Sequence, residues 1–124
     1  LYHLFGDIVG GELPGLEVIL KELDIVNIPK INRAVLVGTA LSPAQPRQKP
    51  DGTTVNTLWG EMAWQLGGAK GYEYIADCDK HGISPGSEAL VELFTACSPA
   101  LILIDEWVAY IRHTYNIHGL PGGT

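Results

Sequence analysis

The stretch that decides the fold is residues 100–106, Ala-Leu-Ile-Leu-Ile-Asp-Glu. Its apolar residues are consecutive rather than alternating, which is typical of a parallel strand covered on both faces. Asp105 and Glu106 follow at the carboxyl end of that strand, the edge at which open α/β sheets bind ligands. The pattern therefore predicts a buried parallel strand over 100–105 with two acidic side chains at a ligand-binding edge.

A second buried strand is predicted over residues 33–39 (RAVLVGT), a short apolar run rich in β-branched residues. Between the strands we expect a proline-rich loop of about a dozen residues, longer than most connections in compact domains. Apolar residues at helical spacing predict four helices, at 15–23, 57–66, 86–97 and 106–115. Gly67-Gly68 is expected to end the second of them. Residues 72–79 suit either a helix or the start of a strand, and we favour the helix.

This alternation of helices and strands predicts an α/β fold with right-handed crossovers and a parallel sheet. We expect a partial three-layer sandwich in which parallel strands at about 33–39 and 100–105 are adjacent and are flanked by helices. Hydrophobic residues make up 46% of the chain and charged residues 18%, as in ordinary soluble globular proteins.

Charge and hydropathy exclude several functional classes. The net charge of -6 and the lack of a basic stripe argue against a general nucleic-acid surface. No apolar run approaches the roughly 20 residues needed to span a membrane, and no signal peptide is recognisable, so we expect a cytoplasmic location. Cys78 and Cys97 form no CxxC pair, which favours free thiols, although a single disulfide stays open.

Four apolar residues followed by Asp-Glu form the pattern known as Walker B. In that reading Asp105 would hold Mg²⁺ near nucleotide phosphates, and Glu106 would polarise or orient the attacking water. Thr39, at the end of the earlier strand, would face the same crevice and is a candidate for contacts on the phosphate side of the cofactor. The alternative is a non-catalytic α/β interaction module, in which Asp105 and Glu106 only cap the helix at 106–115.

Three other groups of residues carry less specific signals. Asp77, Asp79 and His81 could form a metal-dependent site, but charges at a helix end are more often a solvated surface. The glycines and lysine of residues 67–71 lack the GK[ST] ending of a phosphate-binding loop and indicate a turn. The three tryptophans, Trp59, Trp64 and Trp107, lie on or near apolar helical faces and are expected in the core.

Three runs resemble the prokaryotic DUF499 family of predicted AAA-type ATPases: residues 37–43 (VGTALSP), 57–63 (TLWGEMA) and 101–110 (LILIDEWVAY). Tyr2-His3-Leu4 is similar to the tail of the helix that follows that family's glycine-rich loop. The resemblance implies a P-loop-type domain that binds ATP and Mg²⁺, with only Asp105 and Glu106 carried over as nucleotide-site residues. It also implies a biological role linked to DNA modification or phage defence.

The two ends suggest that residues 1–124 are a single fragment of such a P-loop ATPase domain. Residues 1–5 look like the end of a helix, and 121–124 like a loop. The Walker-A loop and the later strands would then belong to the rest of the parent protein, so the fragment alone should be inactive and bind no cofactor. Strand 100–105 would be left with an apolar edge, and we expect a homo-oligomer or strand-exchanged dimer.

Overall fold

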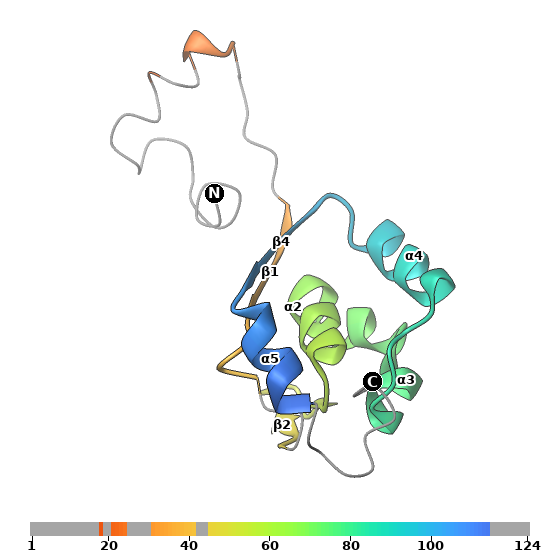
Figure 1. Cartoon of the computed structure of the whole chain (residues 1–124). Coiled ribbons are helices and arrows are strands. Elements are labelled where there is room, and N and C mark those ends of the chain that lie inside the picture. The colour runs from red at the N-terminus through yellow and green to blue at the C-terminus, as the bar shows by residue number, and fades with distance from the viewer. Residues whose placement is uncertain (1–17, 19–20, 25–30, 42–44, 115–124) are drawn as a thin grey trace.

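The computed structural model describes residues 18, 21–24, 31–41 and 45–114. Two strands, β1 (Asn32–Val37) and β4 (Ala100–Asp105), lie side by side and parallel (Figure 1). Their register pairs Val37 with Asp105, so both strands end at the same level. The two predicted strands and their adjacency are confirmed. The predicted burial of strand 100–105 is not found among the described residues, because β4 is half-buried over Leu101–Leu103 and exposed at Ala100, Ile104 and Asp105. β1 ends two residues earlier than expected, and Thr39 lies in the turn that follows it.

Helices flank this sheet and a small hairpin precedes them, which confirms the mixed α/β class. None of the helices in the described ranges is long and apolar enough to cross a bilayer. In chain order the remaining elements are β2 (Arg47–Gln48), β3 (Thr54–Val55), α2 (Leu58–Glu73), α3 (Ala76–His81), α4 (Ser87–Ala96) and α5 (Trp107–Thr114).

The predicted helices at 86–97 and 106–115 correspond to α4 and α5, and the helical assignment of 72–79 is confirmed by the end of α2 and by α3. The long loop contains the antiparallel pair β2–β3, because a turn at Gly52 (φ +87°) returns the chain on itself. Of the predicted helix 15–23, the described residues 18, 21 and 22 are helical. The expectations for residues 1–5 and 121–124 lie outside the described residues.

The prediction that Gly67-Gly68 ends the second helix is wrong. Gly68 leaves helical geometry (φ 60°, ψ −149°), but the chain resumes its helix and α2 continues to Glu73. The continuation buries Tyr72 and brings Gly71 so close to Ala63 that a Cβ on Gly71 would overlap the Ala63 carbonyl oxygen. Glycine therefore kinks this helix instead of stopping it, because packing after the kink holds the second half in place.

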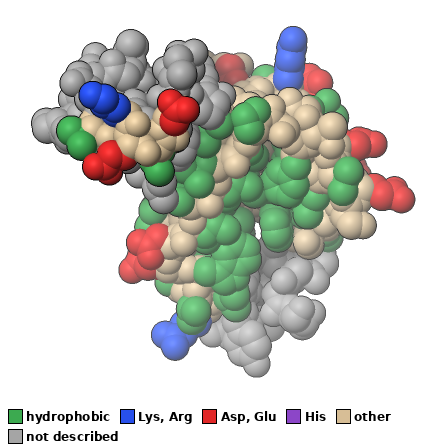
Figure 2. All heavy atoms as spheres, turned by 90° about the horizontal axis from the view of Figure 1, so that it is seen from above, with side chains coloured by type: hydrophobic (Ala, Val, Ile, Leu, Met, Phe, Trp, Pro, Cys, Tyr) green, Lys and Arg blue, Asp and Glu red, His purple; other side chains and the backbone are tan. Residues whose placement is uncertain are grey.

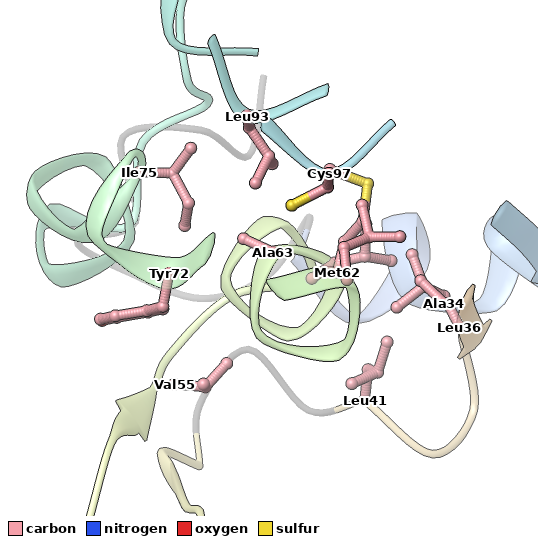
Figure 3. Close-up of a cluster of buried hydrophobic side chains, with 12 residues drawn as sticks. Ala34, Leu36, Leu41, Val55, Met62, Ala63, Tyr72, Ile75, Leu93 and Cys97 are labelled. Carbon is pink, nitrogen blue, oxygen red and sulfur yellow. The ribbon is translucent and has the colours of Figure 1, made fainter. Parts of the chain in front are cut away.

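The core is built around α2 and takes in buried residues of β1, of α4 and of the turn before α3 (Figure 3). Ala34 and Leu36 of β1 are completely buried on the face toward α2, whose Met62, Ala63 and Leu66 are also buried. Burial of a leucine side chain stabilises a fold by about 2 kcal/mol. The contacts between β1 and α2 therefore position the sheet on the helix.

The outer edge of β1 is closed by a side chain rather than by a strand. The Gln65 amide of α2 accepts from the Val35 N–H (2.7 Å) and donates to the Val35 carbonyl (3.0 Å). These are the two bonds that a neighbouring strand would make, so this edge is protected from further pairing. In the part of the chain that the structure describes, β4 has β1 as its one strand partner.

Asp79 of α3 is completely buried and joins that helix to the beginning of α2. Its carboxylate accepts from the backbone N–H and side-chain amide of Asn56, from the backbone N–H and hydroxyl of Thr57, and from the Tyr72 hydroxyl, at 2.6–3.0 Å. A Cβ on Gly60 would overlap this carboxylate, so glycine leaves the space for it. These are neutral donors at a helix N-terminus, where the helix dipole favours a negative charge.

The two cysteines are free thiols, as expected. Cys97 is buried in the core cluster, and this burial raises the pKa of its thiol. A buried, protonated thiol is an inert core residue rather than a nucleophile.

Replacing Asp79 tests the importance of this buried carboxylate. The change Asp79→Asn should lower the free energy of unfolding by about 2–4 kcal/mol, because an NH₂ group would face donors that now bind an oxygen. The matched control is Asp77→Asn on the same helix, which is exposed and should change stability by less than about 0.5 kcal/mol. Urea unfolding followed by circular dichroism measures both, and equal effects would contradict the assignment.

The edge of β4 away from β1, which pairs with no strand among the described residues, leads to a second expectation. Because Gly38 donates to the Asp105 carbonyl, odd-numbered residues of β4 direct their backbone groups to β1, and Ile102 and Ile104 direct theirs outward. We propose that the 124-residue chain pairs through this edge into a dimer or a strand-exchanged dimer.

Light scattering at increasing protein concentration checks this proposal. Ile104→Lys, which places a charge on the edge strand, should shift the chain toward the monomer. Val91→Lys, at an apolar residue of α4 that is also exposed (63%, against 48% for Ile104), should not. A monodisperse monomer at high concentration would argue strongly against edge pairing.

Candidate functional site

The candidate site lies where β1 and β4 end, at the carboxyl edge of the parallel pair. One hydrogen bond, from the Gly38 N–H to the Asp105 carbonyl (2.8 Å), extends the ladder one residue past β1. The next residue, Thr39, then reaches Glu106, and its Oγ1 donates to Glu106 Oε2 at 2.5 Å. The structure thus brings together two candidate residues that are 67 positions apart in the sequence.

Gly38 makes this close approach possible. The residue is buried, and a Cβ built on it would overlap the carbonyl oxygen of Glu106 and crowd the backbone nitrogen of Tyr110 at 3.2 Å. These neighbours are backbone atoms at the start of α5, which cannot move aside as the end of a side chain can. Glycine is therefore required at this position for the two loops to meet.

The backbone of Glu106 has an unusual conformation. Its φ of 53° lies in the left-handed region, which costs a residue with a Cβ on the order of 1 kcal/mol. Hydrogen bonds on both sides hold it there: its N–H donates to Asp105 Oδ1 at 2.8 Å, and its carbonyl accepts from Ala109 at 2.9 Å and Tyr110 at 3.4 Å. The surrounding bonds maintain a strained geometry at the point where the acidic pair leaves the strand.

The acids do not cap α5 in the manner expected. Asp105 accepts from the N–H of Glu106, which precedes the helix, and the Glu106 carboxylate is bound to Thr39 instead of to an amide of the first helical turn. A carboxylate cap would bind the N–H groups two or three residues into the helix. The prediction that Asp105 caps α5 is therefore wrong. This weakens the explanation that Asp105 and Glu106 are present only to cap the helix.

The side chains of Asp105, Glu106 and Thr39 are all exposed. Two neighbouring carboxylates and a hydroxyl form an all-oxygen set, which suits a hard cation such as Mg²⁺ better than a transition metal. Mg²⁺ keeps several of its waters and typically takes one or two carboxylates from the protein. The residues present at this edge of the sheet are thus compatible with Mg²⁺ bound to phosphate.

The segment 67–71 provides no phosphate-binding loop. It was expected to be a turn, but it lies within α2 around the kink at Gly68, and Lys70 is exposed on that helix. A phosphate-binding loop needs consecutive free backbone N–H groups between a strand and a helix. This segment has neither the strand before it nor the open loop.

The alternative metal site does not form. Asp79 points into the core, while Asp77 and His81 are exposed and contact each other at 3.5 Å. No group of three or more His, Cys, Asp or Glu side chains within the described ranges could hold a metal ion. The expectation of a solvated helix end is right for Asp77 and wrong for Asp79, because the latter binds the donors at the start of α2.

Sequence reasoning missed a polar network behind the sheet. Lys49 of the hairpin binds Glu61 Oε1 at 2.7 Å, and Gln65 donates to the same oxygen at 2.8 Å while its amide closes the edge of β1. Glu61 is only 5% exposed, and its Oε2 has no hydrogen-bond partner in the part of the chain that the structure describes. Together with Arg47 and Tyr110, Glu61 lines a cavity of about 10 Å³. Glu61 and Gln65 stand four residues apart, a spacing that indicates a shared helical side.

Aromatic side chains attach α5 to α2. Trp59 and Trp107 pack edge to face, with ring centroids 6.2 Å apart and planes at 74°. The Tyr110 hydroxyl accepts from the Leu58 N–H at 3.1 Å, and burial raises the pKa of that phenol. The tryptophans pack against the core cluster, as expected. The helix that follows Glu106 is therefore anchored to the body of the fold.

Comparison with known proteins supplies one match. The family described as the DUF499 N-terminal domain matches residues 17–118, which include both strands, the acidic pair and Thr39. No functionally curated protein and no solved structure matches the chain. A match over most of the chain agrees with the resemblance seen in the three sequence runs, and the chain belongs to the DUF499 family as part of its N-terminal domain.

Proposed function

We propose that this chain supplies the Walker-B half of an ATP-binding and ATP-hydrolysing site in a larger protein. The observation that carries the proposal is the acidic pair at the end of β4, beside the parallel strand β1. Strands in this arrangement direct their carboxyl ends toward the crevice in which α/β proteins bind nucleotides. The proposal includes the full three-layer P-loop-type sandwich, of which the described residues contain two strands and their helices.

In this proposal the two acids have different tasks. Asp105 ends the strand, so its carboxylate would hold a water of the Mg²⁺ shell, as the acid of this motif does in P-loop proteins. Glu106 would accept a hydrogen bond from the attacking water and orient it, as an ionised carboxylate is acceptor-only. Bound Mg²⁺ would neutralise charge on the phosphates. Phosphate-binding N–H groups and a lysine would come from the rest of the protein.

The contacts of the acids favour this proposal over a non-catalytic interaction module. A pair that only started α5 would bind the amides of its first turn, whereas Asp105 binds the N–H of Glu106, and Glu106 binds Thr39 on the neighbouring strand end. The glutamate is also exposed and strained, features that cluster at functional sites. A residue that only capped a helix would need neither an exposed side chain nor a strained backbone.

The upstream sequence separates the two candidates at little cost. The ATPase predicts a GxxxxGK[ST] motif within a few tens of residues before Leu1 in the full-length protein. If the motif were absent there, the interaction module would be favoured. A link of the parent protein to DNA modification or phage defence is part of the proposal and rests on family resemblance alone.

Glu106→Gln in the full-length protein is the direct test of the catalytic role. The amide keeps the shape of the side chain but is a poor acceptor for a reacting water, so kcat should fall by about 100-fold or more. ATP affinity should stay within about threefold, because the change removes no phosphate contact. Hydrolysis is measured by phosphate release and affinity by titration calorimetry.

Two further variants sharpen this experiment. Asp105→Asn should weaken Mg²⁺-dependent ATP binding, whereas Glu92→Gln, at an exposed glutamate of α4, should change neither quantity. Hydrolysis at the unaltered rate by the Glu106→Gln protein would eliminate the proposed role.

A further inference from the structure

Thr39 makes a contact that limits what else its hydroxyl can do. A threonine hydroxyl has one proton, and that proton is donated to Glu106 Oε2 at 2.5 Å. Phosphate oxygens at neutral pH are acceptors, so binding one requires the same proton. In this geometry Thr39 can serve the glutamate or a phosphate, but it cannot donate to both at once.

The backbone of Glu106 is already fixed by other bonds. Its N–H and carbonyl are held by Asp105 and by the amides of α5, and Gly38 packs against its carbonyl oxygen. These contacts do not fix the side-chain rotamer of Glu106. An exposed glutamate side chain populates several rotamers when nothing binds it. The bond to Thr39 selects one of them. In the described part of the chain, no protein group donates a hydrogen bond to the other carboxylate oxygen, Oε1.

The geometry points to Thr39 as a positioning residue for Glu106 and not as a contact for the phosphates. The inference rests on the proposed function, because it assigns Thr39 a task in the same site. The hydroxyl holds Oε2 so that Oε1 faces the position of the attacking water. A misplacement of about 1 Å at such a group costs up to 100-fold in rate. The turn after β1 therefore contributes to the rate of hydrolysis without binding substrate.

The chain offers a matched pair of substitutions. Thr39→Val has nearly the same shape and no hydroxyl, whereas Thr39→Ser keeps the donor. Both changes are at an exposed residue, so the thermal unfolding midpoint should not move. In the full-length protein we expect Thr39→Val to lower kcat by about 10- to 100-fold with the ATP dissociation constant within about threefold. Thr39→Ser should restore kcat to within about threefold.

A double-mutant cycle distinguishes positioning from phosphate contact. With Glu106→Gln as background, Thr39→Val should have no further effect on kcat, since the group that it positions is gone. A phosphate contact would instead raise the dissociation constant of ATP in both backgrounds. A raised dissociation constant of this kind would overturn the inference. So would a further loss of kcat when Thr39→Val is added to Glu106→Gln, or a higher kcat in the single variant Thr39→Val.

One readout is independent of nucleotide. In the ATP-free protein, the side-chain carboxyl ¹³C resonance of Glu106, assigned by its loss in Glu106→Gln, should move in Thr39→Val and stay in Thr39→Ser. A resonance that is unchanged in both variants would show that the bond between Thr39 and Glu106 does not form. That result would overturn this inference but leave the proposed function standing. If Glu106→Gln leaves hydrolysis intact, the proposed function fails instead, and the positioning role fails with it.

Discussion

The parallel pairing of β1 and β4 is the constraint on which the rest of the molecule depends. The register aligns Val37 with Asp105, so the two strands end together and their following loops start side by side. A shift of one residue would turn every side chain of one strand to the opposite face. It would expose Ala34 and Leu36, which are completely buried, and would separate Thr39 from Glu106. Core packing and the geometry of the candidate site are therefore determined by the same register.

Helix α2 maintains that pairing from one face. Its apolar residues cover β1, and its Gln65 occupies the outer edge of that strand in place of a further strand. The beginning of the helix is in turn held by Asp79, whose charge is surrounded by neutral donors. A buried carboxylate is costly unless its oxygens accept hydrogen bonds, and the Asp79 oxygens accept five. Polar groups inside this small fold thus select one arrangement of its elements.

The apolar surface of the molecule is consistent with a part of a larger sheet. Val91, Ile104, Val108 and Ile111 are between 48% and 63% exposed, although large apolar side chains are usually buried. Hydrophobic side chains also reach the surface over a broad area in the view of Figure 2. Ile104 lies on the strand whose outer edge has no partner strand among the described residues, and Val108 and Ile111 lie on the helix that follows it.

The sequence alone was sufficient for the elements whose signal is local. Consecutive apolar residues at 100–105 predicted β4, and apolar residues at helical spacing predicted α4 and α5, because burial of a repeating pattern dominates the choice of secondary structure. Asp105 and Glu106 were found in the same way, from their position directly after a continuous apolar run. Gly68 shows the limit of local signals, since packing beyond the kink kept the helix going where a glycine pair suggested its end.

Contacts between distant residues were decided only in the tertiary structure. Thr39 was recognised as facing the crevice, but its bond to Glu106 depends on a register, on the absence of a side chain at Gly38 and on a left-handed residue, none of which has a sequence signature. Asp79 looked like a solvated charge because its neighbours in sequence are polar, whereas Asn56 and Thr57, which make four of its five hydrogen bonds, lie 23 and 22 residues away. The sequence by itself determined which residues form strands and helices. The pairing of those elements decided which polar groups meet, because such contacts are set by three-dimensional packing.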